Sequence, residues 1–348
     1  MPKMLKNSRK LWQNKVSEST ERSKITSFIA GKKSRQEFEP LLGPLVDRIH
    51  IDPLHLKNNP CTLAHRLLLN EVLSVSHLGN SMKTFSQVPN TSPFHKYITT
   101  MQNKCNLRRL ANKIIRWYNE CQSINKSFEY RFTGKDSRCF LQNFMFLIDV
   151  VEPFLKDKTK ALFTIHVLAY LCLALRDCVS VFTRIEVTDS QLGDLERNCR
   201  TYYVLHYLHF NHHPTAWTLG NVVPHHAKDM KLKYGFGLGL NSMEGREAKH
   251  ISISQYSKNT HYKSRWEQIF QHEYISLLWL REKGYNSKKL ASDCSLRYMY
   301  TPKRASVDPK FCYCGCEKET ESATCCRFCG HKFSKLLRDK VKYAVTKT

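Results

Sequence analysis

The longest apolar run of this chain limits what it can fold into. Residues 161–182 read ALFTIHVLAYLCLALRDCVSVF, and apolar side chains fall on most faces of a helix built from them. A membrane span needs roughly 20 predominantly apolar residues, whereas His166, Arg176 and Asp177 interrupt this run. We therefore expect a helix buried at the centre of the protein, and no membrane partner.

Helical periodicity continues on both sides of this run. Nearly every segment through the middle of the chain has the apolar spacing of an α-helix, most clearly 97–124 and 139–157. The sequence FTGKDSR, residues 132–138, is typical of a turn between two helices. A further amphipathic helix is expected at 262–284.

A short strand is expected ahead of these helices. Residues 45–52, LVDRIHID, alternate apolar and polar side chains, and Pro53 then stops strand pairing. Helical spacing begins at 61–78, CTLAHRLLLNEVLSVSHL. Strand, carboxylate, loop and helix thus follow in order, and the carboxylate of Asp52 at the strand end can point into a cleft.

A second carboxylate cluster follows a glycine-punctuated stretch. Residues 235–250 read GFGLGLNSMEGREAKH, and we expect a helix that starts near Asn241 or Ser242, either of which can cap it. Glu244 and Glu247 lie one turn apart at the start of this helix, where the helix dipole favours acidic groups. Taken alone, this is ordinary helix charge.

Carboxylates from separate elements are what a two-metal site requires. Phosphoryl transfer by two Mg²⁺ ions uses carboxylates that converge on ions roughly 3.5–4 Å apart. Asp52 at a strand end and Glu244 at a helix start have this character. We therefore consider both as candidate catalytic residues.

The charge balance indicates a polyanionic partner. Fifty-five Lys and Arg against 30 Asp and Glu give a formal net charge of +25, which favours nucleic acid as the partner. Generic basicity of the kind found in ribosomal proteins is the alternative. The basic segment 1–44 can track a phosphate backbone, serve as a nuclear import address or remain a solvated tail.

Particular side chains are candidates for nucleic-acid contacts. Four basic residues just past the glutamate helix are expected to contact phosphates, with salt bridges on a solvated face as the alternative: Lys249, Lys258, Lys263 and Arg265. Trp117 and Trp266 could stack on unpaired bases. Their helical spacing favours a core position for both.

Cysteines gather near the carboxyl end of the chain. No apolar core of signal-peptide length is present at the amino end, so we expect an intracellular protein whose clustered thiols bind metal. Tetrahedral Zn²⁺ needs four N or S ligands from two short knuckles. Cys314, Cys316, Cys326 and Cys329 supply them, with Cys312 and His331 as alternates and a metal-free Cys-rich tail as the competing interpretation.

Three blocks of the chain resemble a known family. Residues 51–73, 131–151 and 237–254 are similar, in this order, to the catalytic subunit of the V(D)J recombinase and to related DDE transposases. The resemblance covers roughly 45–285. It implies that Asp52 matches the second Asp and Glu244 the Glu of a metal triad that binds Mg²⁺ or Mn²⁺.

The resemblance also implies a fold class, mainly α with a small α/β part. An incomplete ribonuclease-H-like core would be interrupted by a large helical insertion and followed by a zinc knuckle. The expected segments are a basic flexible arm at 1–44, a core remnant at 45–80 and the helical insertion at 81–234. The glutamate-bearing helix with the last core helices is expected at 235–290, and the zinc-binding tail at 300–348.

The chain departs from the family pattern in two places. The first Asp of the triad belongs on a strand about a hundred residues upstream of the second, yet only 51 residues precede Asp52, and Asp47 is too close. The family's zinc-binding pair of histidines is matched by His225 in the second place but by Gly220 in the first. The candidate substitutes are His226, His209, His212 and His213, and no CxxC lies upstream to complete the site.

These departures predict a transposase-derived, nuclear DNA-binding protein that is catalytically incomplete. One alternative is an active nuclease or transposase, if a partner chain or a longer product supplies the missing Asp. Another is a non-enzymatic zinc module that binds RNA or protein. Self-association or a second subunit of the recombinase kind would fit the first two hypotheses.

Overall fold

The computed structural model describes most of the middle of the chain. The described residues are 50–79, 81–121, 127–156, 158–259 and 264–283, together with Ser23, Thr26, Ser27 and Ala30. The chain divides into two units, Met1–Ile49 and His50–Thr348. The four single residues belong to the first unit and are helical. Everything that follows concerns the second unit.

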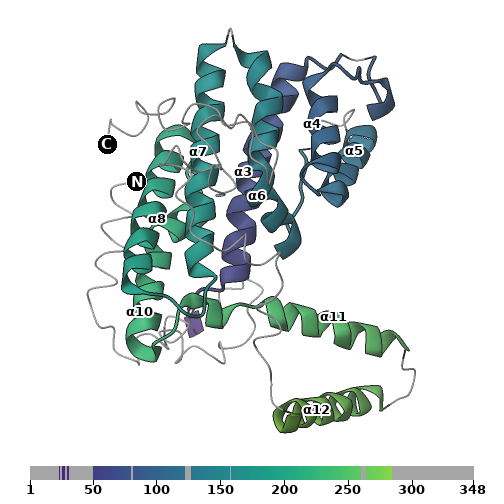
Figure 1. Ribbon diagram of the computed structural model, residues 1–348. Helices are drawn as coiled ribbons and strands as arrows, with labels where there is room; N and C mark the ends of the chain where they lie inside the picture. The colour runs from purple at the N-terminus through teal and green to yellow at the C-terminus, as the bar shows by residue number, and fades with distance from the viewer. Residues whose placement is uncertain are drawn as a thin grey trace, which may run out of the picture. The chain divides into compact units, whose positions relative to one another are not determined.

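The described part of the second unit is mainly helical, as the sequence predicts (Figure 1). Its α-helices are α3 (Pro53–Ser76), α4 (Pro93–Asn103), α5 (Arg108–Cys121), α6 (Gly134–Val151), α7 (Thr159–Phe182), α8 (Asp189–His209), α9 (Pro214–Trp217), α10 (Val223–Tyr234), α11 (Glu244–Asn259) and α12 (Arg265–Lys283). Short 3₁₀ turns lie at Phe85–Gln87, Glu152–Leu155 and Leu238–Asn241, and a π-helical turn, η5, at Thr218–Val222.

No strand occurs within the ranges that the structure describes. Of the expected strand 45–52, only His50, Ile51 and Asp52 are described, and none of the three is in a strand. The ribonuclease-H-like sheet therefore stays a prediction, and the expected zinc knuckle at 300–348 lies outside the described residues.

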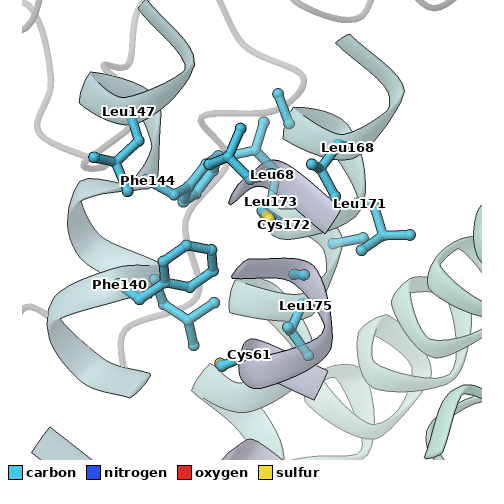
Figure 2. Packing of buried hydrophobic residues seen from close by; sticks show 14 of the residues in the cluster. Cys61, Leu68, Phe140, Phe144, Leu147, Leu168, Leu171, Cys172, Leu173 and Leu175 are labelled. Atoms are coloured by element: carbon cyan, nitrogen blue, oxygen red, sulfur yellow. The ribbon is translucent and has the colours of Figure 1, made fainter. Parts of the chain in front are cut away.

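Helix α7 lies at the centre of the core, which confirms the expectation for 161–182. It packs against α8, α3 and α6, and α3 and α6 also contact each other (Figure 1). By length and composition α7 could cross a membrane, but 94% of its apolar 18-residue window is buried inside the protein. Figure 2 shows Phe144 of α6 beside Leu68 of α3, with Leu168 and Leu171 of α7 farther along the same cluster.

The amino end of α3 differs from the sequence expectation. Residues 53–60 are helical, whereas a loop was expected there, and Asp52 is the N-cap of the helix. Pro53 occupies the first turn, where a helix makes no use of the backbone N–H that proline lacks. A residue that was expected to end a strand therefore begins a helix instead.

The expected helix 97–124 is two helices, α4 and α5. They are separated at 104–107, where Asn106 takes a left-handed conformation with φ of 54°. Helix α6 begins within the expected turn 132–138, because Thr133 caps it and the Thr133 backbone amide donates a hydrogen bond to the carboxylate of Asp136. The connection before α6 is thus shorter than predicted.

Candidate functional site

The glycine-rich stretch before α11 packs its backbone against the end of α7. The amide of Gly237 donates to the carbonyl of Ile185 over 2.6 Å, and the amide of Gly239 donates to the carbonyl of Arg184 over 2.9 Å. A Cβ atom on Gly239 would lie 2.4 Å from the carbonyl oxygen of Thr183, so only glycine permits this approach. These contacts determine where α11 begins.

Asp52 joins the start of α3 to the start of α11. Its Oδ1 atom accepts hydrogen bonds from the backbone amides of Leu54 over 3.0 Å and Met243 over 2.9 Å. Its Oδ2 atom accepts from the amide of His55 over 3.1 Å and contacts Nδ1 of the His55 ring. Asp52 and the residue preceding Glu244 are therefore neighbours, although 191 positions separate them.

These hydrogen bonds determine the ionisation of Asp52. Partial burial raises the pKa of its carboxyl, but hydrogen bonds from the Met243 amide, the His55 ring and the amides of His55 and Leu54 outweigh burial. The pKa of Asp52 consequently lies below its ordinary value. The group is a carboxylate at neutral pH, stabilised by donors from its own protein.

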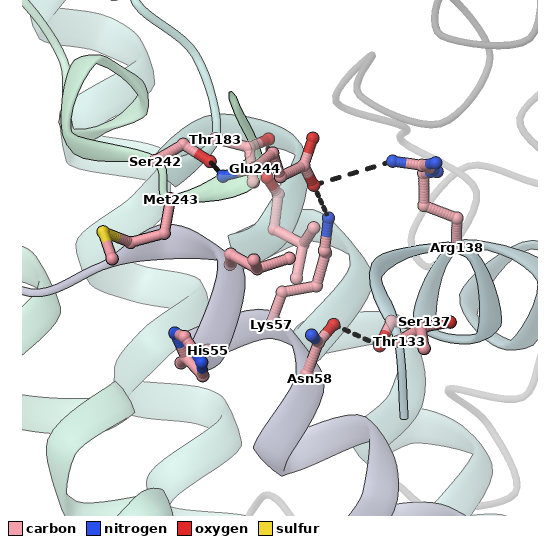
Figure 3. Close-up of polar contacts among 12 residues, drawn as sticks. His55, Lys57, Asn58, Thr133, Ser137, Arg138, Thr183, Ser242, Met243 and Glu244 are labelled. Carbon is pink, nitrogen blue, oxygen red and sulfur yellow. Dashed lines mark hydrogen bonds and ion pairs between the residues drawn. The ribbon is translucent and has the colours of Figure 1, made fainter. Parts of the chain in front are cut away.

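Glu244 lies on two cations rather than in an open acidic cleft (Figure 3). The ammonium group of Lys57 is 2.5 Å from Oε1 of Glu244, and the guanidinium of Arg138 is 3.6 Å from the same atom. Lys57 is fully buried, whereas the Glu244 side chain is 40% exposed. Ser242 Oγ accepts a long hydrogen bond of 3.4 Å from the Glu244 amide, consistent with the expected capping role.

Sequence reasoning missed Lys57 and Arg138. Lys57 follows Pro53 by four positions and precedes Cys61 by four, which places it on the inward face of a helix that starts at Asp52. If the helix had been predicted to start at Asp52, this spacing would have placed Lys57 among the residues that face the core. Arg138 lies near the start of α6, within the stretch expected to be a turn.

The oxygens of this cluster leave little room for a divalent cation. A carboxylate offers about four lone-pair positions, and Asp52 accepts four donors. Glu244 is already compensated by Lys57 and Arg138, and the described residues contain no group of three His, Cys, Asp or Glu side chains placed to hold a metal ion. In this arrangement the donor set does not fit a two-metal site. The role of Asp52 and Glu244 as ancestral metal ligands stays a prediction.

The histidines considered for zinc make other contacts. His225 is exposed, and its ring centroid lies 5.9 Å from that of His226. His226 accepts a hydrogen bond from the Ile51 amide over 3.2 Å, and the neighbouring His50 ring bonds Asp229 over 2.9 Å. The first family place, Gly220, is closed to a side chain, because a Cβ there would lie 2.4 Å from Cβ of Tyr203.

The expected phosphate-binding side chains have different environments. Lys249 forms an ion pair with Glu273 that joins α11 to α12, which corresponds to the salt-bridge alternative. Lys258 is exposed, and the Arg265 guanidinium lies 5.5 Å from the Trp266 ring centroid. Lys263 lies outside the described residues.

The two tryptophans also differ from each other. Trp117 is partly buried and packs against the core, as its helical spacing predicts. Trp266 is 45% exposed, so the core interpretation is wrong for this residue. Its ring is thus available to a partner.

The expected zinc ligands of the tail lie outside the described residues. They are Cys312, Cys314, Cys316, Cys326, Cys329 and His331. Comparison with protein-family models, with curated proteins and with solved structures found no match. The resemblance to the recombinase family therefore also stays a prediction.

Proposed function

We propose that this chain is a DNA-binding protein of transposase descent that does not cleave DNA unaided. The observation that carries the proposal is the cluster at the start of α11. Asp52 and Glu244 meet at neighbouring helix starts, as descent from a metal site would require, but backbone amides, Lys57 and Arg138 take up their oxygens. The cluster would then have become a structural joint.

The charge of the chain supports a polyanionic partner. The formal net charge is +25, and exposed basic side chains such as Lys113, Arg200 and Lys258 lie on different described helices. Neutralising phosphates releases condensed counterions, so binding through such side chains weakens steeply with salt. Generic basicity without a nucleic-acid partner would give no defined complex.

The test combines salt-dependent binding with a cleavage assay on the same duplex. We expect fluorescence anisotropy to give a log–log slope of affinity against salt near −0.9 for each phosphate contacted. We expect no strand cleavage in Mg²⁺ or Mn²⁺. Asp52→Asn and Glu244→Gln variants serve as controls, since each removes one carboxylate charge.

Each outcome separates the competing hypotheses. A flat salt response would exclude DNA binding through phosphates and leave the protein-binding module. Tighter binding of RNA than of DNA would replace DNA as the partner. Cleavage by the unmodified protein that both variants lose would show that another carboxylate completes the site, and the protein would be an active nuclease.

A further inference from the structure

A cavity of about 540 Å³ lies beside the amino-terminal half of α3. Its walls come from α3, from the connection that precedes α6 and from the start of α9. The residues used in the following argument are Asn59, Arg66, Glu129, Tyr130, Arg131 and His213. Ligand pockets range from about 300 to 1,000 Å³, so this one can hold a group of nucleotide size.

Two arginines face this cavity without a carboxylate partner. Arg66 of α3 and Arg131 of the connection are both exposed, and neither forms an ion pair or hydrogen bond with another described residue. A guanidinium group binds phosphate through paired N–H donors. Glu129 is the one acidic residue among the described residues that line the cavity, which leaves a net positive charge.

His213 supplies a third donor from another element. Its Nδ1 atom accepts a hydrogen bond from the Thr215 amide over 3.2 Å, so the neutral ring carries its proton on Nε2. The side-chain amide of Asn59 on α3 is exposed and adds N–H donors. Donors from three separate segments therefore surround one space, as expected for a site that binds an anion.

Tyr130 adds an aromatic surface to the same cavity. Its hydroxyl donates to Oδ2 of Asp136 over 3.0 Å. The Phe128 ring stacks on it with centroids 6.1 Å apart, and the Arg109 guanidinium lies 5.8 Å from its centroid, so the ring is held in place and only partly open. Bases of unpaired nucleotides stack on aromatic rings in proteins that bind single strands. A ring beside phosphate-binding donors suits a nucleotide better than free phosphate.

We propose that this cavity binds the phosphate and base of an unpaired nucleotide, at an end or in a single-stranded segment of nucleic acid. The proposal rests on the proposed function, because it names the form of nucleic acid that the protein recognises. The cavity shares no residue with the cluster of Asp52 and Glu244. The two sites can be tested separately.

The test measures binding of AMP and of inorganic phosphate to the full chain by calorimetry. We expect AMP to bind about tenfold more tightly than phosphate, because only AMP stacks. Arg66→Gln and Arg131→Gln should each weaken AMP binding by about tenfold, the effect of losing a charge-assisted hydrogen bond. Glu129→Gln should strengthen it. Arg200→Gln is the control, since it removes the same charge from an exposed position of α8 that does not line the cavity.

A single-stranded oligonucleotide identifies the source of the nucleotide. We expect it to displace AMP, and a blunt duplex of equal length without terminal phosphates to displace AMP poorly. Failure of the single strand to displace AMP would overturn the nucleic-acid source. Equal effects of Arg200→Gln and Arg66→Gln would show a general charge effect and overturn the pocket.

The pocket and the proposed function fail in different ways. Salt-sensitive duplex binding without any AMP binding would overturn the pocket and leave the function standing. AMP binding without duplex or single-strand binding would overturn the function. Circular dichroism of each variant confirms that the substitutions, all at exposed positions, leave the fold intact.

Discussion

Lys57 is a buried cation whose partner reaches solvent. The ammonium group is fully buried, whereas Glu244 is 40% exposed and Arg138 also contacts it. Removing one member of a buried ion pair is costly when the other charge is left buried, and replacing a buried charge by an apolar group of similar volume often costs little. The two partners should therefore respond differently to substitution.

We predict that Glu244→Gln lowers the free energy of unfolding by about 1–3 kcal/mol, because it removes the carboxylate charge from the ion pair with the buried Lys57. Lys57→Met should change it by less than about 1 kcal/mol, because Glu244 keeps Arg138 and water. Urea unfolding measures both. A Lys57→Met variant less stable than Glu244→Gln would contradict this account.

His65 is a second buried polar residue, surrounded by aromatic rings. Its ring lies 5.4 Å from that of Phe132 and 6.0 Å from that of Phe140, and its Nε2 atom has no hydrogen-bond partner among the described residues. Burial lowers the pKa of His65 to about 3, although Asp136 opposes this effect. The ring is therefore neutral in the folded protein.

A lowered histidine pKa makes stability depend on pH. The His65 ring binds a proton near pH 6.5 in the unfolded chain and near pH 3 in the folded chain. The stability that depends on its neutral form is therefore complete above pH 6.5 and is lost as the pH falls toward 3. At pH 5 the loss is about 2 kcal/mol. We predict that His65→Phe unfolds in urea with a smaller difference between pH 7.5 and 5.0 than the unmodified protein.

The exposed His250 provides the control for this experiment. A His250→Gln variant should retain the full pH dependence, because its ring is solvated in both states. If His65→Phe and His250→Gln behaved alike, another group would be responsible for the acid sensitivity.

Among the elements, α8 and the π-helical turn η5 make an unusually close contact. A Cβ atom on Gly220 would lie 2.4 Å from Cβ and 2.7 Å from Cγ of Tyr203, which are atoms close to the α8 backbone. Rotation about χ1 of Tyr203 moves Cγ but leaves Cβ in place, so the closest contact remains. Any residue larger than glycine must therefore separate the two elements.

We predict that Gly220→Ala lowers the free energy of unfolding by about 1–3 kcal/mol, the usual cost of overpacking. Gly193→Ala in α8 is the matched control, because the nearest atom to its added Cβ is Nη1 of Arg197 at 3.7 Å. This control should raise stability by about 0.5–1 kcal/mol. Thermal unfolding of both variants checks the sign of each change, and a neutral Gly220→Ala would contradict the close contact.

The sequence predicted the elements that carry strong periodicity and missed those that depend on local exceptions. Helix α7 was predictable because apolar residues cover most of its faces. The first two turns of α3 were missed because Pro53 and Pro60 are usually breakers, yet both lie within it. The break between α4 and α5 has no glycine or proline, and Asn106 supplies the left-handed residue instead.

The candidate site was predictable to the same limited extent. That Asp52 and Glu244 belong near one another followed from the resemblance, and the hydrogen bond between Asp52 and the Met243 amide is consistent with it. The inward position of Lys57 follows from its spacing once the start of α3 is known, but its full burial depends on α3 packing against helices more than 70 positions away. A lysine in a sequence is ordinarily assigned to the surface.

At the scale of the whole molecule, one hydrophobic core includes both the expected core remnant and the expected helical insertion, which the resemblance would assign to different parts of the protein. Buried residues from Leu56 to Leu238 form a single cluster, so α3 and the helices of the expected insertion share their packing. Whatever the ancestry of α3, its stability now depends on α6 and α7.

The bond between Asp52 and Met243 also has a consequence for the order in which the chain assembles. At a translation rate of 5–20 residues per second, Met243 follows Asp52 from the ribosome by about 10–40 s. Helix formation takes about 0.1–1 μs, and collapse takes up to about 100 μs for a chain of about 100 residues. Helix α3 and its neighbours through α10 therefore have time to form while the Oδ1 atom of Asp52 still binds water in place of the Met243 amide. The last contact to be made at this joint is thus the one that positions Glu244, and nascent chains that stop before it would carry the helical core without the cluster.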